Sequence, residues 1–235
     1  DKETGEISCY NDGLGIPVEI HKEEKMYVPE MIFGTLLTSG NYNTRGKTVG
    51  GKNGMGAKLT NIFSTDFYLE VIDHVRGKKF VQEFSNNMYS RTEPKITNVT
   101  SKISNMTIKF IPDYKRFSMK GLTDDFVGLF KKRVYDIAAC SGSTIKVYLN
   151  DKQIKIGSFQ EYISMFYNPE VEMRCIYDEG DNGRWKVGVV FDNNSGYQHM
   201  SYVNSICTFK GGKHVDHVVD NLVKRIKELI ENKNK

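Results

Sequence analysis

Apolar and polar residues alternate along parts of the chain and recur every three to four residues along others. Alternation runs through residues 66–74 and 78–84, on either side of a glycine-containing turn, and it predicts a pair of strands. A helical spacing marks residues 27–37 and, most clearly, residues 213–230, where apolar side chains form one stripe. This mixture of the two periods predicts an α+β fold.

Shorter patterns predict the remaining elements. We expect strands at residues 7–10 and 106–113, helices at residues 57–64 and 122–139, and a hairpin at residues 143–156 that turns at Asn150 and Asp151. A second unit is expected to begin after Gly157, with a helix near residues 159–167, strands within residues 184–192 and 197–208, and the terminal helix. The predicted domains are therefore residues 1–156 and 157–235.

A glycine-rich loop precedes the helix expected at residues 57–64. It does not match the Walker pattern, because Ala57 stands where that pattern requires lysine, and it does not match the GxGxxG pattern of dinucleotide-binding folds. Gly54 and Gly56 can nevertheless adopt positive φ and let backbone amides approach phosphate oxygens, while Lys52 and Lys58 add positive charge. The loop is interpreted either as a phosphate-binding loop or as a flexible surface loop.

A second motif, NDGLGIP, follows the first expected strand. The Asp12 carboxylate could accept a hydrogen bond from the exocyclic amine of adenine, and Gly13 would let a flat ring lie against the backbone. Guanine would place its exocyclic oxygen against the carboxylate and be repelled, so adenine would be preferred. The alternative is an Asx-turn, in which Asp12 bonds only its own backbone.

Composition narrows the class of protein only modestly. The 235 residues carry a net charge of +4, which permits contact with nucleic acid without predicting it. No apolar run approaches the roughly 18 residues of a membrane span, so we expect no membrane partner. The four cysteines form no CxxC pair, which favours a reduced compartment over a disulfide framework or a zinc site.

The two motifs together are far rarer than either alone, and here the sequence resembles the ATPase region of eukaryotic-type type IIA DNA topoisomerases. This family belongs to the GHKL superfamily, with gyrase, MutL, histidine kinases and a heat-shock chaperone. The matching stretches run from Asn11 almost to the C-terminus: NDGLGIPVEIHKEEKMYVPEMIFGTLLTSGNYN, GGKNGMGAKLTNIFST, YDIA and YVNSICTFKGGKHVDHV. The resemblance implies a two-layer α/β sandwich of the GHKL type, followed by part of an α/β transducer domain.

The resemblance also implies cofactors, partners and a set of nucleotide-binding residues. ATP would bind with magnesium, a second copy of the chain would close onto the first, and double-stranded DNA would be the substrate of the parent enzyme. The localisation would be nuclear, or cytoplasmic for a cytoplasmic virus. The implied ATP-binding residues are Asp12, Gly13, Gly15, Ser39, Gly40, Asn41, Gly51, Lys52, Asn53, Gly54, Met55, Gly56, Ala57, Lys58 and Thr107. Lys233 is a candidate DNA contact.

The sequence departs from the family pattern in one strand and at both ends. The family threonine near the base falls at Met106, with Thr107 one residue later, so that contact is either shifted or lost. The family's catalytic glutamate and magnesium-binding asparagine are expected on a helix before Asp1. The lysine loop that meets the γ-phosphate is expected after Lys235. No catalytic residue and no metal ligand is therefore assigned within the sequence.

Two other classes of protein remain open. A GHKL relative could serve as a nucleotide-gated dimerisation module, like a gyrase B or MutL clamp, without topoisomerase activity. A plain DNA-binding domain is a second alternative, against which the modest charge and the lack of a reader motif both argue. The pair His214 and His217 lacks an evident third ligand, so we expect no metal site there.

We expect these 235 residues on their own to show no ATP turnover above background. General-base assistance contributes roughly 10²–10⁴-fold to rate, and the glycine loop supplies only a cradle for phosphates. A steady-state ATPase assay, with Lys58→Ala as the control for contaminating enzymes, measures this. Turnover that depends on Lys58 would show that a general base lies within the sequence after all.

Overall fold

The computed structural model describes residues 1–36, 38–40, 43, 46, 48–167, 175–180, 182–191 and 196–233. The chain divides into two compact units, residues 1–127 and 128–235, and helix α3 (Asp124–Ser141) begins in the first and ends in the second. The domain boundary expected after residue 156 stays a prediction. None of the helices in the described part of the chain has the length and apolar content of a membrane-spanning segment.

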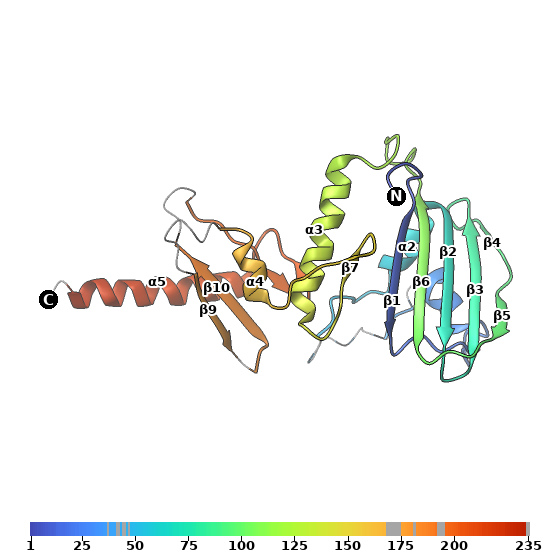
Figure 1. Cartoon of the computed structure of the whole chain (residues 1–235), viewed down its shortest axis with the longest axis horizontal. Coiled ribbons are helices and arrows are strands. Elements are labelled where there is room, and N and C mark those ends of the chain that lie inside the picture. The colour runs from blue at the N-terminus through green and yellow to red at the C-terminus, as the bar shows by residue number, and fades with distance from the viewer. Residues whose placement is uncertain are drawn as a thin grey trace. The chain divides into compact units, whose positions relative to one another are not determined.

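The first unit is built on one antiparallel sheet (Figure 1). Its strands are β1 (Ile7–Gly13), β2 (Ser64–Asp73), β3 (Lys78–Ser85), β4 (Ser90–Arg91), β5 (Lys95–Asn98) and β6 (Ser104–Pro112). The order is β1-β6-β2-β3-β4, with β5 also pairing with β3. The strands β1 and β6 are neighbours although about ninety residues separate them along the chain, so their pairing is a long-range contact.

Two short helices, α1 (Val28–Gly34) and α2 (Gly56–Ile62), lie on one face of this sheet (Figure 1). Strand β2 buries every second side chain, and Phe67 and Val71 stand directly opposite Phe84 and Phe80 of β3. Phe33 of α1 closes the same cluster from the helical side. Burial of apolar surface stabilises a fold by about 25 cal/mol per Å², so this cluster contributes to the stability of the unit. The predicted two-layer α+β fold is confirmed.

In its described residues, the second unit combines α3 with short hairpins and two further helices. They are β7 (Tyr148–Leu149), β8 (Lys152–Gln153), α4 (Phe159–Ser164), β9 (Cys175–Gly180), β10 (Trp185–Val190), β11 (Tyr202–Val203), β12 (Ile206–Cys207) and α5 (Lys213–Lys233). The predicted hairpin turn is confirmed, because Asn150 and Asp151 both have positive φ between β7 and β8. Such a turn matches the right-handed twist of paired strands.

A buried carboxylate ties the elements of the second unit together. Asp136 of α3 accepts hydrogen bonds from the hydroxyls of Tyr162 on α4, at 2.5 Å, and Tyr202 on β11, at 2.9 Å. The ammonium of Lys132, one helical turn away, lies 2.7 Å from the same carboxylate. Burial and the bond to Asp136 raise the pKa of the Tyr162 hydroxyl. The Asp136 carboxylate thereby connects α3, α4 and β11, which are distant from one another in the sequence.

Candidate nucleotide-binding site

The loop after β1 is held in place at two points. Gly15 has φ of +78°, and a Cβ there would lie 2.4 Å from the Cβ of Ser104 on β6. Three residues on, the backbone amide of Val18 donates to the buried carboxylate of Asp73 at 2.9 Å. The loop therefore packs directly on the ends of β6 and β2, and only glycine fits at its closest approach.

Asp73 is the anchor at the end of β2. It is 3% exposed and also accepts hydrogen bonds from the backbone amides of Val75 and Arg76, while the guanidinium of Arg76 lies 3.1 Å away. Burial alone would raise the pKa of the Asp73 carboxyl. The backbone amides of Val18 and Arg76 and the Arg76 charge outweigh burial and hold that pKa below its ordinary value.

The register between β1 and β6 decides which residues of NDG face the helices. Asn11 stands opposite Met106, which packs against the apolar core, whereas Asp12 stands opposite Asn105. Side chains alternate between the faces of a strand, and directly paired residues share a face. Asn11 therefore lies on the helix-covered face, and Asp12 lies on the opposite one.

Thr107 follows the same rule. It pairs with Tyr10 and lies between Met106 and Ile108, which both pack against the core. The strand has not shifted, so the position on the helix-covered face belongs to Met106, and Thr107 points away from it. Asp12 and Thr107, both inferred from the sequence, thus lie on the wrong face of the sheet for a site beside the helices. Asn11 was missed, although the alternation of Ile7 and Cys9 extends to it.

The glycine loop before α2 packs against the segment from Thr38 to Gly40. Gly54 has φ of +61°, and a Cβ there would lie 2.4 Å from the carbonyl oxygen of Thr38. The hydroxyl of Ser39 donates to the carbonyl of Lys52 at 2.9 Å. The two segments, which lie about fourteen residues apart in the sequence, form one surface.

Lys58 joins the same two segments from within. Its ammonium is buried and donates to the carbonyl and the hydroxyl oxygen of Thr38, at 2.9 and 2.7 Å. Burial lowers the pKa of Lys58, and among the described residues it has no carboxylate partner. Lys58 thus positions Thr38 in this conformation, whereas Lys52 is exposed and presents its charge to solvent.

The remaining predicted residues differ in how closely they are packed. A Cβ at Gly40, Gly51 or Gly56 would meet nothing within 4 Å, so the backbone is open to approach at these three positions. Asn53 is exposed, and Met55 and Ala57 are partly buried. Asn41 lies outside the described residues. Lys233, the candidate DNA contact, is exposed at the end of α5 in the second unit.

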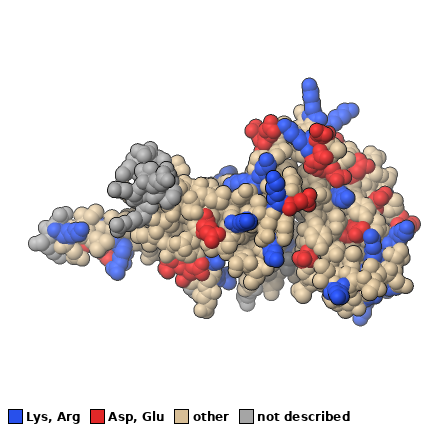
Figure 2. Space-filling view, in the orientation of Figure 1, with Lys and Arg blue, Asp and Glu red and all other residues tan. Residues whose placement is uncertain are grey.

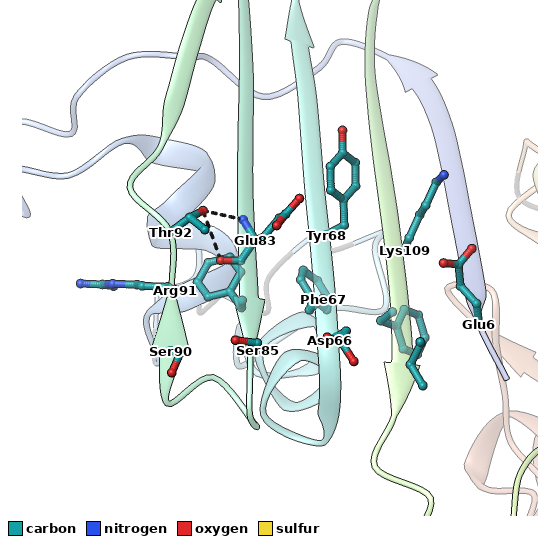
Figure 3. A pocket seen from close by; sticks show the side chains of 13 residues that line it. Glu6, Asp66, Phe67, Tyr68, Glu83, Ser85, Ser90, Arg91, Thr92 and Lys109 are labelled. Carbon is teal, nitrogen blue, oxygen red and sulfur yellow. Dashed lines mark hydrogen bonds between the residues drawn. The ribbon is translucent and has the colours of Figure 1, made fainter. Parts of the chain in front are cut away.

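A shallow depression of about 480 Å³ lies elsewhere, on the sheet face that no helix covers in the described part of the chain (Figure 3). Its polar lining includes Tyr68 and Glu83, which alternate with the buried core residues of β2 and β3. Burial and the neighbouring Glu70 raise the pKa of Tyr68 to about 12. The depression contains no residue of the two glycine loops, so it is separate from the candidate site.

No group of three or more His, Cys, Asp or Glu side chains is placed to hold a metal ion in the described residues. The candidate site consists of the exposed Asn11, the loop held by Asp73, and the glycine loop packed against the segment that Lys58 holds. The open backbone at Gly51 and Gly56, beside the exposed Lys52, is suited to an anionic group.

The chain is similar to known proteins over nearly its whole length. It is 49% identical to DNA topoisomerase 2 of Acanthamoeba polyphaga mimivirus over 100% of this chain and 19% of that protein. It is 44% identical to DNA topoisomerase 2 of Saccharomyces cerevisiae over 97% of this chain and 17% of that protein. The chain thus spans less than a fifth of the length of these curated relatives. A family model described as DNA gyrase B matches residues 145–235.

Solved structures give the same result. The crystal structure of the ATPase region of Saccharomyces cerevisiae topoisomerase II aligns with a TM-score of 0.90 and 44% identity, over 98% of this chain and 60% of that one. The ATPase and transducer domains of topoisomerase II from Balamuthia mandrillaris align with a TM-score of 0.90 and 40% identity, over 99% of this chain and 59% of that one.

Gly54→Ala should lower the free energy of unfolding by about 1–2 kcal/mol, because an L-residue is strained at positive φ, and the clash with Thr38 adds to this. Gly51→Ala is the matched control, because its Cβ would enter open space. Urea denaturation of the three proteins measures the difference. Equal losses in both variants would show that the loop does not pack on Thr38.

Asp73→Asn should lower the free energy of unfolding by roughly 1.5–3 kcal/mol near neutral pH, the range for hydrogen bonds to a charged group. The folded-state pKa of Asp73 lies below the unfolded value of about 3.9. Its contribution is therefore present above the unfolded pKa and is lost as pH falls through the folded pKa. The difference between wild type and variant, measured by denaturation at several pH values, should shrink in acid. A difference that stays constant would contradict this role.

Proposed function

The chain belongs to the DNA topoisomerase II family, and from that membership we propose that it is the ATP-binding part of an enzyme that passes one DNA duplex through another. The observation that carries the proposal is the alignment of 98% of this chain with a topoisomerase II ATPase region at 44% identity. The alternative, a nucleotide-gated clamp without topoisomerase activity, is not favoured, because the curated relatives cited above are named DNA topoisomerase 2.

We propose that the base of ATP lies near Asn11. A carboxamide can accept a hydrogen bond from the exocyclic amine of adenine and donate one to a neighbouring ring nitrogen, as it does when Asn reads adenine in DNA. Asn11 is exposed at the end of β1 and shares a face with Met106 and α2. An amide can also rotate to present its NH₂ group to guanine, so Asn11 should discriminate less sharply than a carboxylate.

The triphosphate would follow the glycine loop. Phosphate oxygens could approach the backbone amides without steric hindrance at Gly51 and Gly56. Lys52 supplies an exposed positive charge. Lys58 would act differently from Lys52. In the described conformation it holds Thr38, and through it Ser39, against the loop, so it would shape the cradle. Donation from Lys58 to phosphate would require the two bonds to Thr38 to be exchanged.

In this proposal magnesium would bind together with ATP, at its phosphates. The described residues offer no cluster of carboxylates or histidines that fits the ion, so no step of the mechanism is derived through it. We also propose that a second copy of the chain is the dimer partner, that double-stranded DNA is the substrate, and that the protein acts in the nucleus, or in the cytoplasm if it serves a cytoplasmic virus.

The test of the base site compares two neighbouring residues. Asn11→Ala should weaken ATP binding by about tenfold, because a hydrogen bond of roughly 1–1.5 kcal/mol is lost. Asp12→Ala should leave binding almost unchanged, because its side chain lies on the opposite face of the sheet. Competition titration with ATP and GTP on both variants measures affinity and preference.

The same two variants, placed in the whole protein, test the activity. Interlinked duplex circles should separate only when ATP is present, and Asn11→Ala should require a higher ATP concentration for the same rate. If only Asp12→Ala required a higher ATP concentration, the base contact would be assigned to Asp12 and not to Asn11. Failure of the wild-type protein to separate the circles would reject the topoisomerase assignment itself.

A further inference from the structure

Positive charge is concentrated in one short stretch of the second unit. Residues 128–156 contain six Lys and Arg residues and two Asp residues, so they carry a net charge of +4, equal to that of the whole chain. The other residues hold 27 positive and 27 negative side chains and are neutral in sum. Over the first unit, Figure 2 shows both signs intermixed. A local excess of positive charge favours association with an anionic partner.

The hairpin β7–β8 sorts its side chains onto two faces. Tyr148 pairs with Gln153, and a hydrogen bond from the amide of Ile154 to the carbonyl of Val147 continues the ladder by one pair. Val147, Leu149 and Ile154 are partly buried on one face. The exposed residues of the other face are Lys146, Tyr148, Gln153 and Lys155, and we refer to these four residues as the lysine face.

Two like charges stand across from each other on the lysine face. The register that pairs Tyr148 with Gln153 brings Lys146 opposite Lys155, one pair beyond the last hydrogen bond. Among the described residues neither lysine forms an ion pair, in contrast to Lys132, which Asp136 neutralises. Like charges directly opposite each other on paired strands are destabilising. An anionic partner would remove this repulsion.

We propose that the lysine face binds the phosphate backbone of double-stranded DNA, an inference that rests on the topoisomerase function proposed above. Lysine ammonium groups, a tyrosine hydroxyl and a glutamine amide are all donors that proteins use toward phosphate oxygens. A two-stranded ribbon also has dimensions that a DNA groove accepts. The face carries no carboxylate and no aliphatic side chain, so it is suited to a polyanion and not to an apolar partner.

The experiment measures binding of the protein to a fluorescent duplex of random sequence, about 30 base pairs long, over a salt series. Each phosphate contact contributes about −0.9 to the slope of log K against log salt. The double variant Lys146→Gln/Lys155→Gln should therefore reduce the steepness of that slope by about 1.8. Its affinity deficit relative to wild type should shrink about tenfold as salt rises from about 50 to about 200 mM.

Two matched variants complete the design. Lys22→Gln/Lys102→Gln removes the same charge from exposed lysines of the first unit, which have no ion pair among the described residues, and should leave the slope nearly unchanged. Lys146→Arg/Lys155→Arg keeps the charge and should keep the slope. Circular dichroism of each variant establishes that it is folded, and we expect the double Gln variant to be no less stable than wild type.

The outcomes separate this proposal from the function on which it rests. Equal slopes for the two Gln variants, with wild-type binding intact, would overturn the lysine face alone. Absence of duplex binding by the wild-type protein would overturn both the lysine face and the proposed DNA substrate. Equal competition by polyglutamate at the same charge concentration would also overturn the proposal, because the face would then accept acidic protein as readily as DNA.

Discussion

The register between β1 and β6 is the constraint on which the candidate site depends. The apolar side chains of β2, together with Phe80 and Phe84 on β3, can be buried only if one face of the sheet meets the helices. Strand β6 pairs with β2, and β1 pairs with β6, so the same face continues to the edge strand. A slip of one residue would exchange the faces. The core therefore determines that Asn11, and not Asp12, lies beside the helices.

Two buried charged groups then hold the loops that the sheet alone would leave free. Asp73 binds the amide of Val18 and so positions the loop that follows β1. Lys58 binds Thr38 and so positions the segment that faces the glycine loop. A charge that is buried must find partners for its hydrogen bonds. Because those partners include backbone groups of the loops themselves, the buried charges define the loop geometry.

The second unit uses the same device in a different place. Asp136 gathers Lys132, Tyr162 and Tyr202 around one carboxylate, and it joins α3, α4 and β11. Lys146 and Lys155 of the lysine face, in contrast, form no ion pair among the described residues. Under the function proposed above, the lysine face would contact DNA while the first unit binds ATP.

Local sequence determined the elements whose signals lie within a few residues of one another. The alternation of β2 and β3, the Asn150-Asp151 turn and the glycine loop before α2 all depend on periods or turns that neighbouring residues specify. The tertiary structure decided the rest. The pairing of Asn11 with Met106 and the bond from Lys58 to Thr38 join residues that the chain separates. Such contacts depend on how the core packs, and a local pattern carries no information about the distant strand it will meet.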